Sequence, residues 1–574
     1  MKALCLLAAL ALLGAPVDAR ALEEPPVELV HVTANTGFAA GGHIALHVGD
    51  YAYHFEVWAD GWLRLGREEW ELFRLRYGTL ENRGMHATEL ELGEAGRGRL
   101  HRELLTLWSR QSADLARLDA FETARQWSEH RAGSEAPVLP GAGFFAEGRV
   151  GDPHAAALRN AVARQLAAGH VASERARVEA ALVKWGTGDD PDALRDALLL
   201  RAALLALAEE RGLEVGALVD PEAGFEESQP LSPAEREQLS GLARGLEETV
   251  ARLAVSRRSD RGRPLLLAMA RYQAVRRSLD EGIWLLLDAV SGDEPAFEPG
   301  ESERHRALLE RLAERAALGW RAERSLAFEG SLDEPAYNGL EEAATGVYEM
   351  RAALTAGRPI RARALGKLVP ARWGHVVPLR PFSGVPEVDV ESARLREERF
   401  RAVLAERYHY DLLLRNCSTE LAGLIRLGAP GVEPGAAAFS PVLLSNHVGA
   451  SRIAGVRTNL PSYRRGRVEE FVQKEGRLRV ALRESNTLTS TAYEGSLRDD
   501  HFLFFADGSP WLRPAQGTAN LVYGLGHAAA GLATAPFDRG QRLRGGLQGA
   551  FYSLPELVGV SIRKGRYDLV PLQR

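Results

Sequence analysis

Two histidines near the start of the chain have the residue type and spacing of a catalytic site. The sequence alternates between apolar and polar residues on both sides of Gly49-Asp50, a pair typical of a tight primed turn, and so predicts a β-hairpin. Because side chains alternate between the faces of a strand, His43, His54 and Glu56 share one face, with His47 and two alanines. A solvated face would carry lysine, glutamate, threonine and serine. We therefore interpret this face as a candidate site.

The predicted turn also gives the register of the hairpin. With Gly49 and Asp50 as the loop residues, Ala45 faces His54 and His43 faces Glu56. His43 and His54 are then diagonal neighbours, about 7–8 Å apart at the backbone. The opposite face is apolar or aromatic and should pack on a core; it consists of Ile44, Leu46, Val48, Tyr51, Tyr53 and Phe55.

Cys417 is the candidate nucleophile. The chain has two cysteines, and the other, Cys5, lies in a predicted signal peptide, so Cys417 has no partner for an intramolecular disulfide. A buried, inert thiol is the alternative. However, Asn416 is a good N-cap, and the apolar spacing from Cys417 through Leu421 to Ile425 is that of one helix face. A cysteine at a helix N-terminus is expected to favour the thiolate, which attacks carbonyl carbon.

The first residues predict export. Met1-Lys2 precede an apolar run of about a dozen residues and then small residues suited to cleavage, so we interpret residues 1–21 as a signal peptide. A membrane anchor would need ~20 apolar residues. The protein is thus expected to be secreted or periplasmic.

The order of these motifs resembles the permuted papain-like superfamily, whose members include lecithin:retinol acyltransferase and the NlpC-type cell-wall amidases. More narrowly, three pieces resemble the periplasmic domain of Lnb-type proteins, which are bacterial lipoprotein N-acyltransferases. These are Gly42-His43, then Glu81-Asn82-Arg83 with Leu90-Glu91-Leu92, and finally Tyr410 through Asn416-Cys417-Ser418-Thr419.

The resemblance implies a role for each candidate residue. Cys417 would be the nucleophile, His43 the base, and His54 the residue that orients His43, with Glu56 as an alternative for that last role. Asn416 and Tyr410 would support the nucleophile. The implied substrate is a lipid, a lipoprotein or a peptidoglycan-derived molecule, attacked at an ester or amide through a thioester.

Composition along the chain predicts an α+β protein in four parts after the signal peptide. Two halves of a permuted papain-like domain, residues 27–118 and 356–462, flank an Ala-, Leu-, Arg- and Glu-rich helical insertion, residues 119–355. Residues 463–574 read as a mixed, strand-rich region, because segments such as 477–482 and 502–505 have strand character.

Several alternatives stay open at this point. Transfer of an acyl group from lipid to an amine, cleavage of a cell-wall peptide, and non-catalytic binding in the envelope all fit the sequence. The net charge of −6 argues against a nucleic-acid partner, and no cofactor motif is present. Zinc held by His43, His54 and Glu56 is a weaker interpretation, because Cys417 is available as a nucleophile; His43 and His47 would lie about 13 Å apart on a strand, too far to share one metal. The Ala- and Gly-rich segment 519–535 predicts a packed helix or hairpin, with peripheral membrane contact as the alternative.

Overall fold

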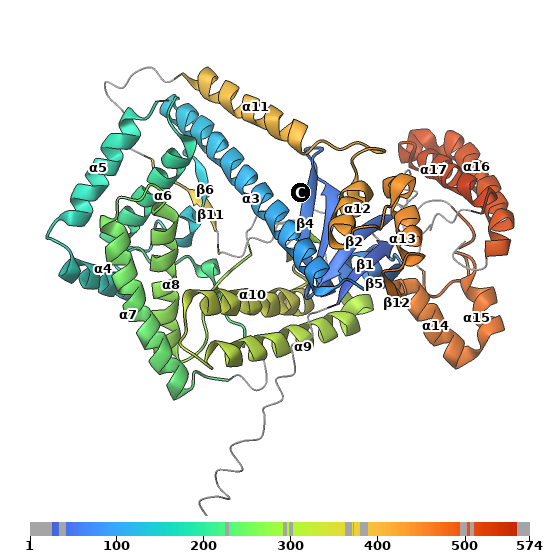
Figure 1. The fold of residues 1–574 in the computed structure, drawn as a ribbon, viewed down its shortest axis with the longest axis horizontal. Coiled ribbons are helices and arrows are strands. Elements are labelled where there is room, and N and C mark those ends of the chain that lie inside the picture. The colour runs from blue at the N-terminus through green and yellow to red at the C-terminus, as the bar shows by residue number, and fades with distance from the viewer. Residues whose placement is uncertain are drawn as a thin grey trace, which may run out of the picture.

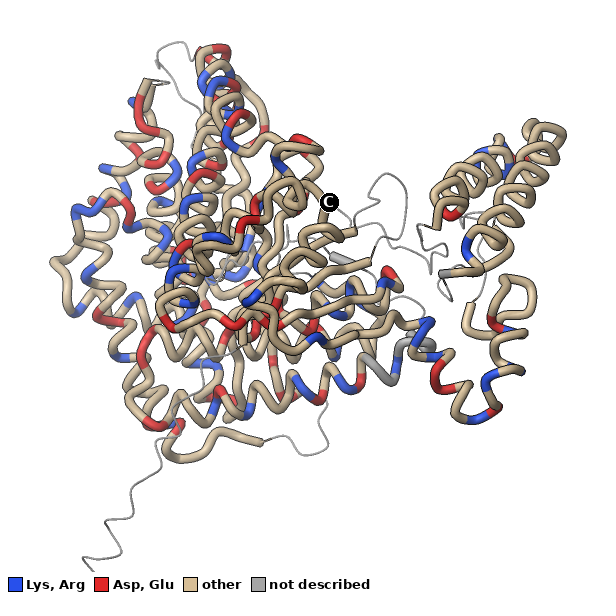
Figure 2. Tube along the Cα trace, turned by 45° about the vertical axis from the view of Figure 1, so that its right-hand side comes forward, with Lys and Arg blue, Asp and Glu red and all other residues tan. Residues whose placement is uncertain are grey.

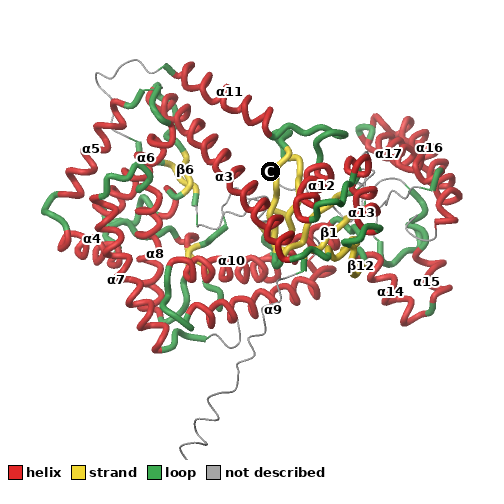
Figure 3. Tube along the Cα trace, viewed as in Figure 1, coloured by secondary structure: helices red, strands yellow, loops and turns green. Residues whose placement is uncertain are grey.

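The computed structural model describes residues 26–33, 42–186, 188–223, 229–290, 296–297, 302–361, 370, 372–378, 389–493, 502–505 and 510–559. The predicted signal peptide lies outside the described residues. The fold is mixed α and β, with a six-stranded antiparallel sheet between a large helical region and a second group of helices (Figures 1 and 3).

The sheet is formed by the N-terminal strands and one strand that comes from much later in the chain. Its order is β12-β5-β1-β2-β3-β4. The strands are β1 (Val27–Val32), β2 (His43–Val48), β3 (Tyr51–Val57), β4 (Leu63–Glu69), β5 (Met85–Leu90) and β12 (Ala454–Leu460). Residues on either side of the long helical region therefore build one sheet.

The predicted hairpin is confirmed. Strands β2 and β3 pair with Val48 opposite Tyr51 and Ala45 opposite His54. Gly49 adopts a φ of 61°, as a primed turn requires. The ladder ends at the Ala45–His54 pair, so it does not extend to the predicted pair of His43 and Glu56.

Both faces of the sheet are covered. The apolar face packs on α3 (Glu94–Arg131), α12 (Cys417–Gly428) and α13 (Pro441–Gly449), with Leu46 and Leu421 in the shared core. The face that carries His43 and His54 lies under α2 (Trp70–Arg74) and a π-helical turn, Leu75–Leu80, where Phe73 and Tyr77 cover it. The histidines therefore lie against protein rather than on an open surface.

The long region after α3 is mostly helical and has its own core, which contains Trp127, Trp284 and Trp320. Three short two-stranded ladders tie it together: β6 (Val138–Pro140) with β11 (Trp373–His375), β7 (Leu218–Val219) with β8 (Leu286–Leu287), and β9 (Ala296–Phe297) with β10 (Ile360–Arg361). Its helices are α4 (Pro153–Gln165), α5 (His170–Lys184), α6 (Pro191–Ala208), α7 (Pro233–Val255), α8 (Gly262–Glu281), α9 (Ser302–Ala327), α10 (Glu334–Ala356) and α11 (Val390–Arg407).

The C-terminal region is helical, so the prediction of a strand-rich region there is wrong. The predicted strand at 477–482 lies in helix α15 (Arg477–Glu484), and residues 502–505 make only an isolated bridge, between Phe504 and Asn486. The other helices are α14 (Tyr463–Glu475), α16 (Arg513–Asp538) and α17 (Gln541–Leu557). Among the described helices, none has the length and apolar character needed to cross a membrane.

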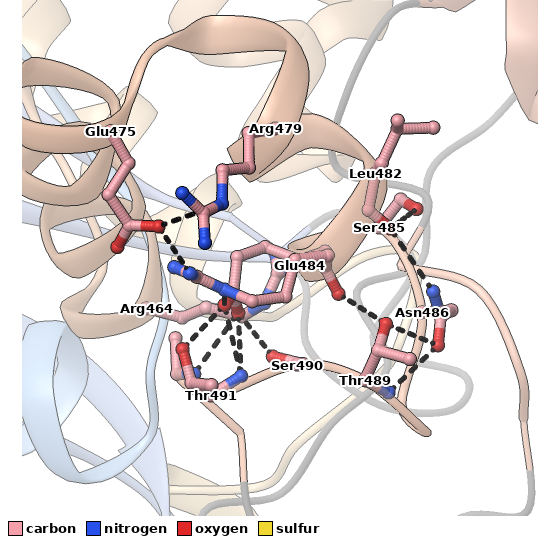
Figure 4. A network of polar contacts seen from close by, with 12 residues as sticks. Arg464, Glu475, Arg479, Leu482, Glu484, Ser485, Asn486, Thr489, Ser490 and Thr491 are labelled. Atoms are coloured by element: carbon pink, nitrogen blue, oxygen red, sulfur yellow. Dashed lines mark hydrogen bonds and ion pairs between the residues drawn. The ribbon is translucent and has the colours of Figure 1, made fainter.

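A polar network joins this region to the turn that precedes β5. The side-chain oxygen of Asn82 accepts a hydrogen bond of 2.8 Å from the backbone N–H of Arg464. The Arg464 guanidinium lies 3.6 Å from the ring centre of Phe505 and also donates to the Glu484 carbonyl (Figure 4). The Glu484 carboxylate accepts from the hydroxyls of Ser490 and Thr491, both at 2.6 Å.

Candidate active site

Cys417 is the first residue of α12, as the sequence predicts. The Asn416 side-chain oxygen accepts hydrogen bonds from the N–H groups of Ser418 and Thr419, at 2.8 and 3.0 Å, and the Thr419 hydroxyl accepts from the Asn416 N–H. This capping box begins the helix at Cys417 and directs Leu421 and Ile425 into the core. The amide nitrogen of Asn416 also donates to two loop carbonyls, those of Leu412 and Phe439. Asn416 thus positions both the nucleophile and the loop beside it.

The N-terminus of α12 lies against the start of β2, next to His43. The backbone N–H of Ile44 is close enough to the Cys417 thiol to act on its pKa, as are the N–H groups of Ser418 and of Cys417 itself. In a two-residue hairpin, alternate residues of β2 direct their N–H toward β3, and Ile44 is one of them. Since the ladder ends at Ala45, this N–H faces the thiol rather than strand β3.

His43 and His54 are in direct contact. Nε2 of His43 lies 3.1 Å from Nδ1 of His54, and the two rings meet edge to face. The His43 ring also stacks on Tyr77, with centroids 5.3 Å apart. His54 is fully buried. The structure therefore brings together the two histidines that the sequence placed on one face.

Glu68 extends this chain of contacts. Its carboxylate lies 3.5 Å from Nε2 of His54, and both side chains are inaccessible to solvent. Arg76 lies 3.6 Å from Glu68 and 3.6 Å from Glu56, so its guanidinium compensates the buried carboxylate. The sequence had left open whether His54 or Glu56 orients His43; in the structure His54 contacts His43, whereas Glu56 contacts Arg76.

The charge of the buried carboxylate bears on where the protons lie on the two rings, although at 3.5 Å it makes no hydrogen bond to His54. A carboxylate facing Nε2 of His54 favours the tautomer with its proton on that nitrogen, so Nδ1 of His54 is an acceptor. Nε2 of His43 must then donate to it. We infer that Nδ1 of His43 holds the free lone pair, which is the form a general base needs.

The pKa values of the base and the nucleophile move in opposite directions. Burial, with the nearby His54 and Arg83, lowers the pKa of His43 well below its usual value, so its imidazole is neutral at pH 7. Burial raises the pKa of the Cys417 thiol to about 11, although the surrounding N–H groups oppose this rise. Desolvation thus opposes the resting thiolate that the helix N-terminus favours, at a cysteine that is partly buried. Both shifts favour the neutral thiol and imidazole over the thiolate and imidazolium, so a proton transfer to His43 would have to accompany attack on a substrate.

Two further side chains lie near the thiol. Tyr410 is close enough for the charge on Cys417 to raise the pKa of its hydroxyl, after the larger effect of burial. The charge of the Arg83 guanidinium lowers the pKa of both Cys417 and His43. Arg83 is fixed by the carbonyl of Thr33, at 2.7 Å, and by Glu81, at 2.9 Å.

The sequence analysis missed Glu68 and Gly66 on β4. Gly66 pairs with His54, and a Cβ at this position would lie 3.0 Å from Nε2 of the His54 ring. A signal for both was present, since Arg64, Gly66 and Glu68 alternate with Leu63, Leu65 and Arg67. His47, by contrast, stands apart from the pair: it contacts Glu28 at 2.6 Å and stacks on Trp70.

Within the part of the chain that the structure describes, no three His, Cys, Asp or Glu side chains are grouped to hold a metal ion. Comparison of the chain with family models, with curated proteins and with solved structures finds no match.

Proposed function

We propose that this protein is an exported cysteine-dependent acyl-transfer enzyme whose sheet and α12 form a permuted papain-like domain, interrupted by the helical region. The observation that carries the proposal is the chain of contacts from Glu68 through His54 to His43, at the start of the strand whose Ile44 N–H lies near the Cys417 thiol. A buried carboxylate fixes the tautomer of one imidazole, which fixes that of the next, beside a cysteine at a helix N-terminus.

In the first step, Nδ1 of His43 takes the thiol proton as the Cys417 sulfur attacks the carbonyl carbon of an ester or amide. The N–H groups of Ile44 and Cys417, which act on the thiol in the free protein, would help to stabilise the resulting oxyanion, with Arg83 as a nearby positive charge. The C–O or C–N bond then breaks, and His43 returns the proton to the leaving group. A thioester remains on Cys417.

In the second step, an acceptor amine or water attacks the thioester. His43 takes the proton of the acceptor, the C–S bond breaks, and the thiol is regenerated. Transfer to an amine gives an acyltransferase, as the Lnb-type resemblance implies, and transfer to water gives a hydrolase. Both use the same residues.

The surface beside Cys417 favours a lipid acyl donor over a cell-wall peptide. Three consecutive leucines, Leu412, Leu413 and Leu414, are exposed in the loop that precedes the nucleophile, and Leu414 is 82% accessible. Asp411 holds this loop by accepting from the N–H groups of Leu413 and Leu414. Because contiguous exposed apolar side chains mark binding surfaces, this loop suits an acyl chain better than a polar peptide.

The test is the mass of the covalent intermediate. The full chain is incubated with phospholipid vesicles of one acyl composition, quenched in acid and measured by intact-protein mass spectrometry. We expect an adduct of fatty-acyl mass on Cys417 that neutral hydroxylamine removes, and none in Cys417→Ala or His43→Ala. His47→Ala is the matched control, because His47 shares the strand but not the contacts of His43.

Other outcomes would separate the alternatives. A peptide-fragment adduct after incubation with cell-wall peptides, with none from lipid, would identify an amidase. If neither substrate class modifies the wild-type protein, the non-catalytic binding alternative is favoured and the enzyme proposal fails.

A further inference from the structure

The C-terminal helices α16 and α17 form a hairpin whose interface is made of small residues. A Cβ on Gly524 would lie 2.6 Å from the backbone nitrogen of Ala550, and one on Gly531 would lie 2.3 Å from that of Leu543. A Cβ on Gly546 would lie 2.3 Å from the nitrogen of Ala528. The two helix backbones are therefore in direct contact along the hairpin.

The large apolar side chains of the hairpin point outward. Phe537 is 88% exposed and Leu532 is 66% exposed. The other exposed apolar residues are Val522, Leu525, Leu547, Phe551, Leu554, Leu557 and Val558. A helical hairpin in water normally buries such residues between its helices, whereas helices in lipid pack through glycine and alanine and direct large residues to the acyl chains.

The distribution of charged residues along the hairpin also fits a lipid environment. No aspartate, glutamate, lysine or arginine occurs between Arg513 and Asp538, a stretch that Figure 2 shows as a mostly tan helix. Arginines stand at its ends: Arg513 before it, and Arg539, Arg542 and Arg544 in the connection to α17 and its first turn. Their positive charge complements anionic phospholipid headgroups.

The exposed residues of α16 also cover too wide an arc for one partner helix. At 100° per residue, positions such as Val522, Leu525, Ala530 and Leu532 span roughly half of the helix circumference. A second copy of the hairpin would cover a narrow stripe, but a lipid phase covers the whole outward arc. The polar groups inside, Asn520 and Glu556, contact each other at 3.4 Å.

We propose that the α16–α17 hairpin is a membrane-binding element that lies in the interface of an anionic phospholipid bilayer, with its outward apolar residues among the acyl chains. Trp511, which is 92% exposed next to the start of α16, would lie at the headgroup level. This inference rests on the packing of the hairpin and does not depend on the chemistry of Cys417.

The experiment is vesicle flotation of the full chain with phosphatidylglycerol–phosphatidylethanolamine vesicles. We expect wild type to float, and Leu532→Glu and Phe537→Glu each to lower the partition coefficient by about tenfold or more. Leu318→Glu on α9 is the matched control, because Leu318 is 64% exposed, nearly as much as Leu532. Pure phosphatidylcholine vesicles should bind more weakly, since they lack the anionic headgroups.

Two further measurements keep the outcomes distinct. Cys417→Ala should float like wild type, so a failed acyl-transfer proposal would leave this one standing. Vesicles carrying brominated acyl chains should quench wild-type fluorescence more than that of Trp511→Phe. If wild type binds no vesicle, or if Leu532→Glu only dissociates a dimer seen by light scattering, the membrane proposal is overturned.

Discussion

The Glu68 carboxylate lies 3.5 Å from Nε2 of His54, across β3 and β4, and neither side chain is reached by solvent. Burying a carboxylate costs several kcal/mol of stability unless it is paired and hydrogen-bonded. A carboxylate in this position is therefore expected to have a function. We propose that this function is to favour one tautomer of His54 and, through it, one tautomer of His43.

The first prediction concerns Glu68→Gln. A glutamine amide can donate to Nε2 of His54, which would move the proton to Nδ1 and reverse the hydrogen bond to His43. We expect acyl transfer to fall roughly 10- to 100-fold with the fold retained. The nitrogen chemical shifts of the two rings should report the changed tautomer. Glu69→Gln, next along β4 but on its other face, is the control; equal losses in both variants would contradict the role of Glu68.

A second prediction concerns the space that Gly66 leaves for the His54 ring. In Gly66→Ala the new methyl would press on Nε2 at 3.0 Å and displace the ring from His43 or Glu68. Turnover should fall about tenfold or more while the circular dichroism spectrum stays native. Gly98→Ala on α3 meets only the flexible end of Arg102, at 3.4 Å, and should keep full activity. Full activity in Gly66→Ala would show that the His54 position does not matter.

The third prediction is the pH dependence of the site. Because burial lowers the pKa of His43 well below its usual value of 6.5, activity should persist below pH 6.5 and fall only when this imidazole protonates. Because the thiol has a pKa of about 11, iodoacetamide labelling of Cys417 in the free protein should rise with pH toward 11 without a neutral plateau. A labelling plateau at pH 6–8 would indicate a resting thiolate and contradict this assignment.

The fourth prediction concerns the two roles of Asn416, which caps α12 with its side-chain oxygen and holds the neighbouring loop with its amide nitrogen. Asn416→Asp keeps the oxygen that caps α12 but loses the amide that holds the carbonyls of Leu412 and Phe439, whereas Asn416→Ala loses both. The alanine variant should lose about 1–2 kcal/mol of stability, and the aspartate variant less. Urea unfolding measures the difference. If the two variants are equally destabilised, the amide contacts rather than the cap dominate.

The fifth prediction concerns acid stability of the C-terminal region. Burial would raise the pKa of Glu484, but hydrogen bonds from Ser490 and Thr491 hold it at about 2, below its ordinary value of 4.5. A carboxyl whose pKa is depressed on folding stabilises the fold above its unfolded pKa and loses this effect as the pH falls. Stability of wild type relative to Glu484→Gln should therefore be largest above pH 5 and should shrink between about pH 4.5 and 2. A difference that does not change with pH would refute it.

Local signals explain what the sequence predicted well. The Gly49-Asp50 turn and the Asn416 cap act within a few residues, so the hairpin and the start of α12 could be placed in advance. The alternation along β4 could have placed Glu68 on a strand, but not beside His54, because that contact depends on which strand pairs with β3 and on the helix that covers this face. Segment 477–482 was predicted as a strand because apolar and charged residues alternate in it. The same residues also fit a helix, since Leu478 and Leu482 are four residues apart, and both are exposed on α15.

Helix α3 contacts a different part of the molecule at each of its ends. Its 38 residues begin against α12, where a Cβ on Gly96 would lie 2.3 Å from the Gly428 carbonyl oxygen, and they end beside α11, where Arg125 pairs with Glu397 at 2.7 Å. It thus connects α12 with the distant helical body. A shift of that body against the sheet would therefore act first on the Gly428 end of α12, which is the end opposite Cys417.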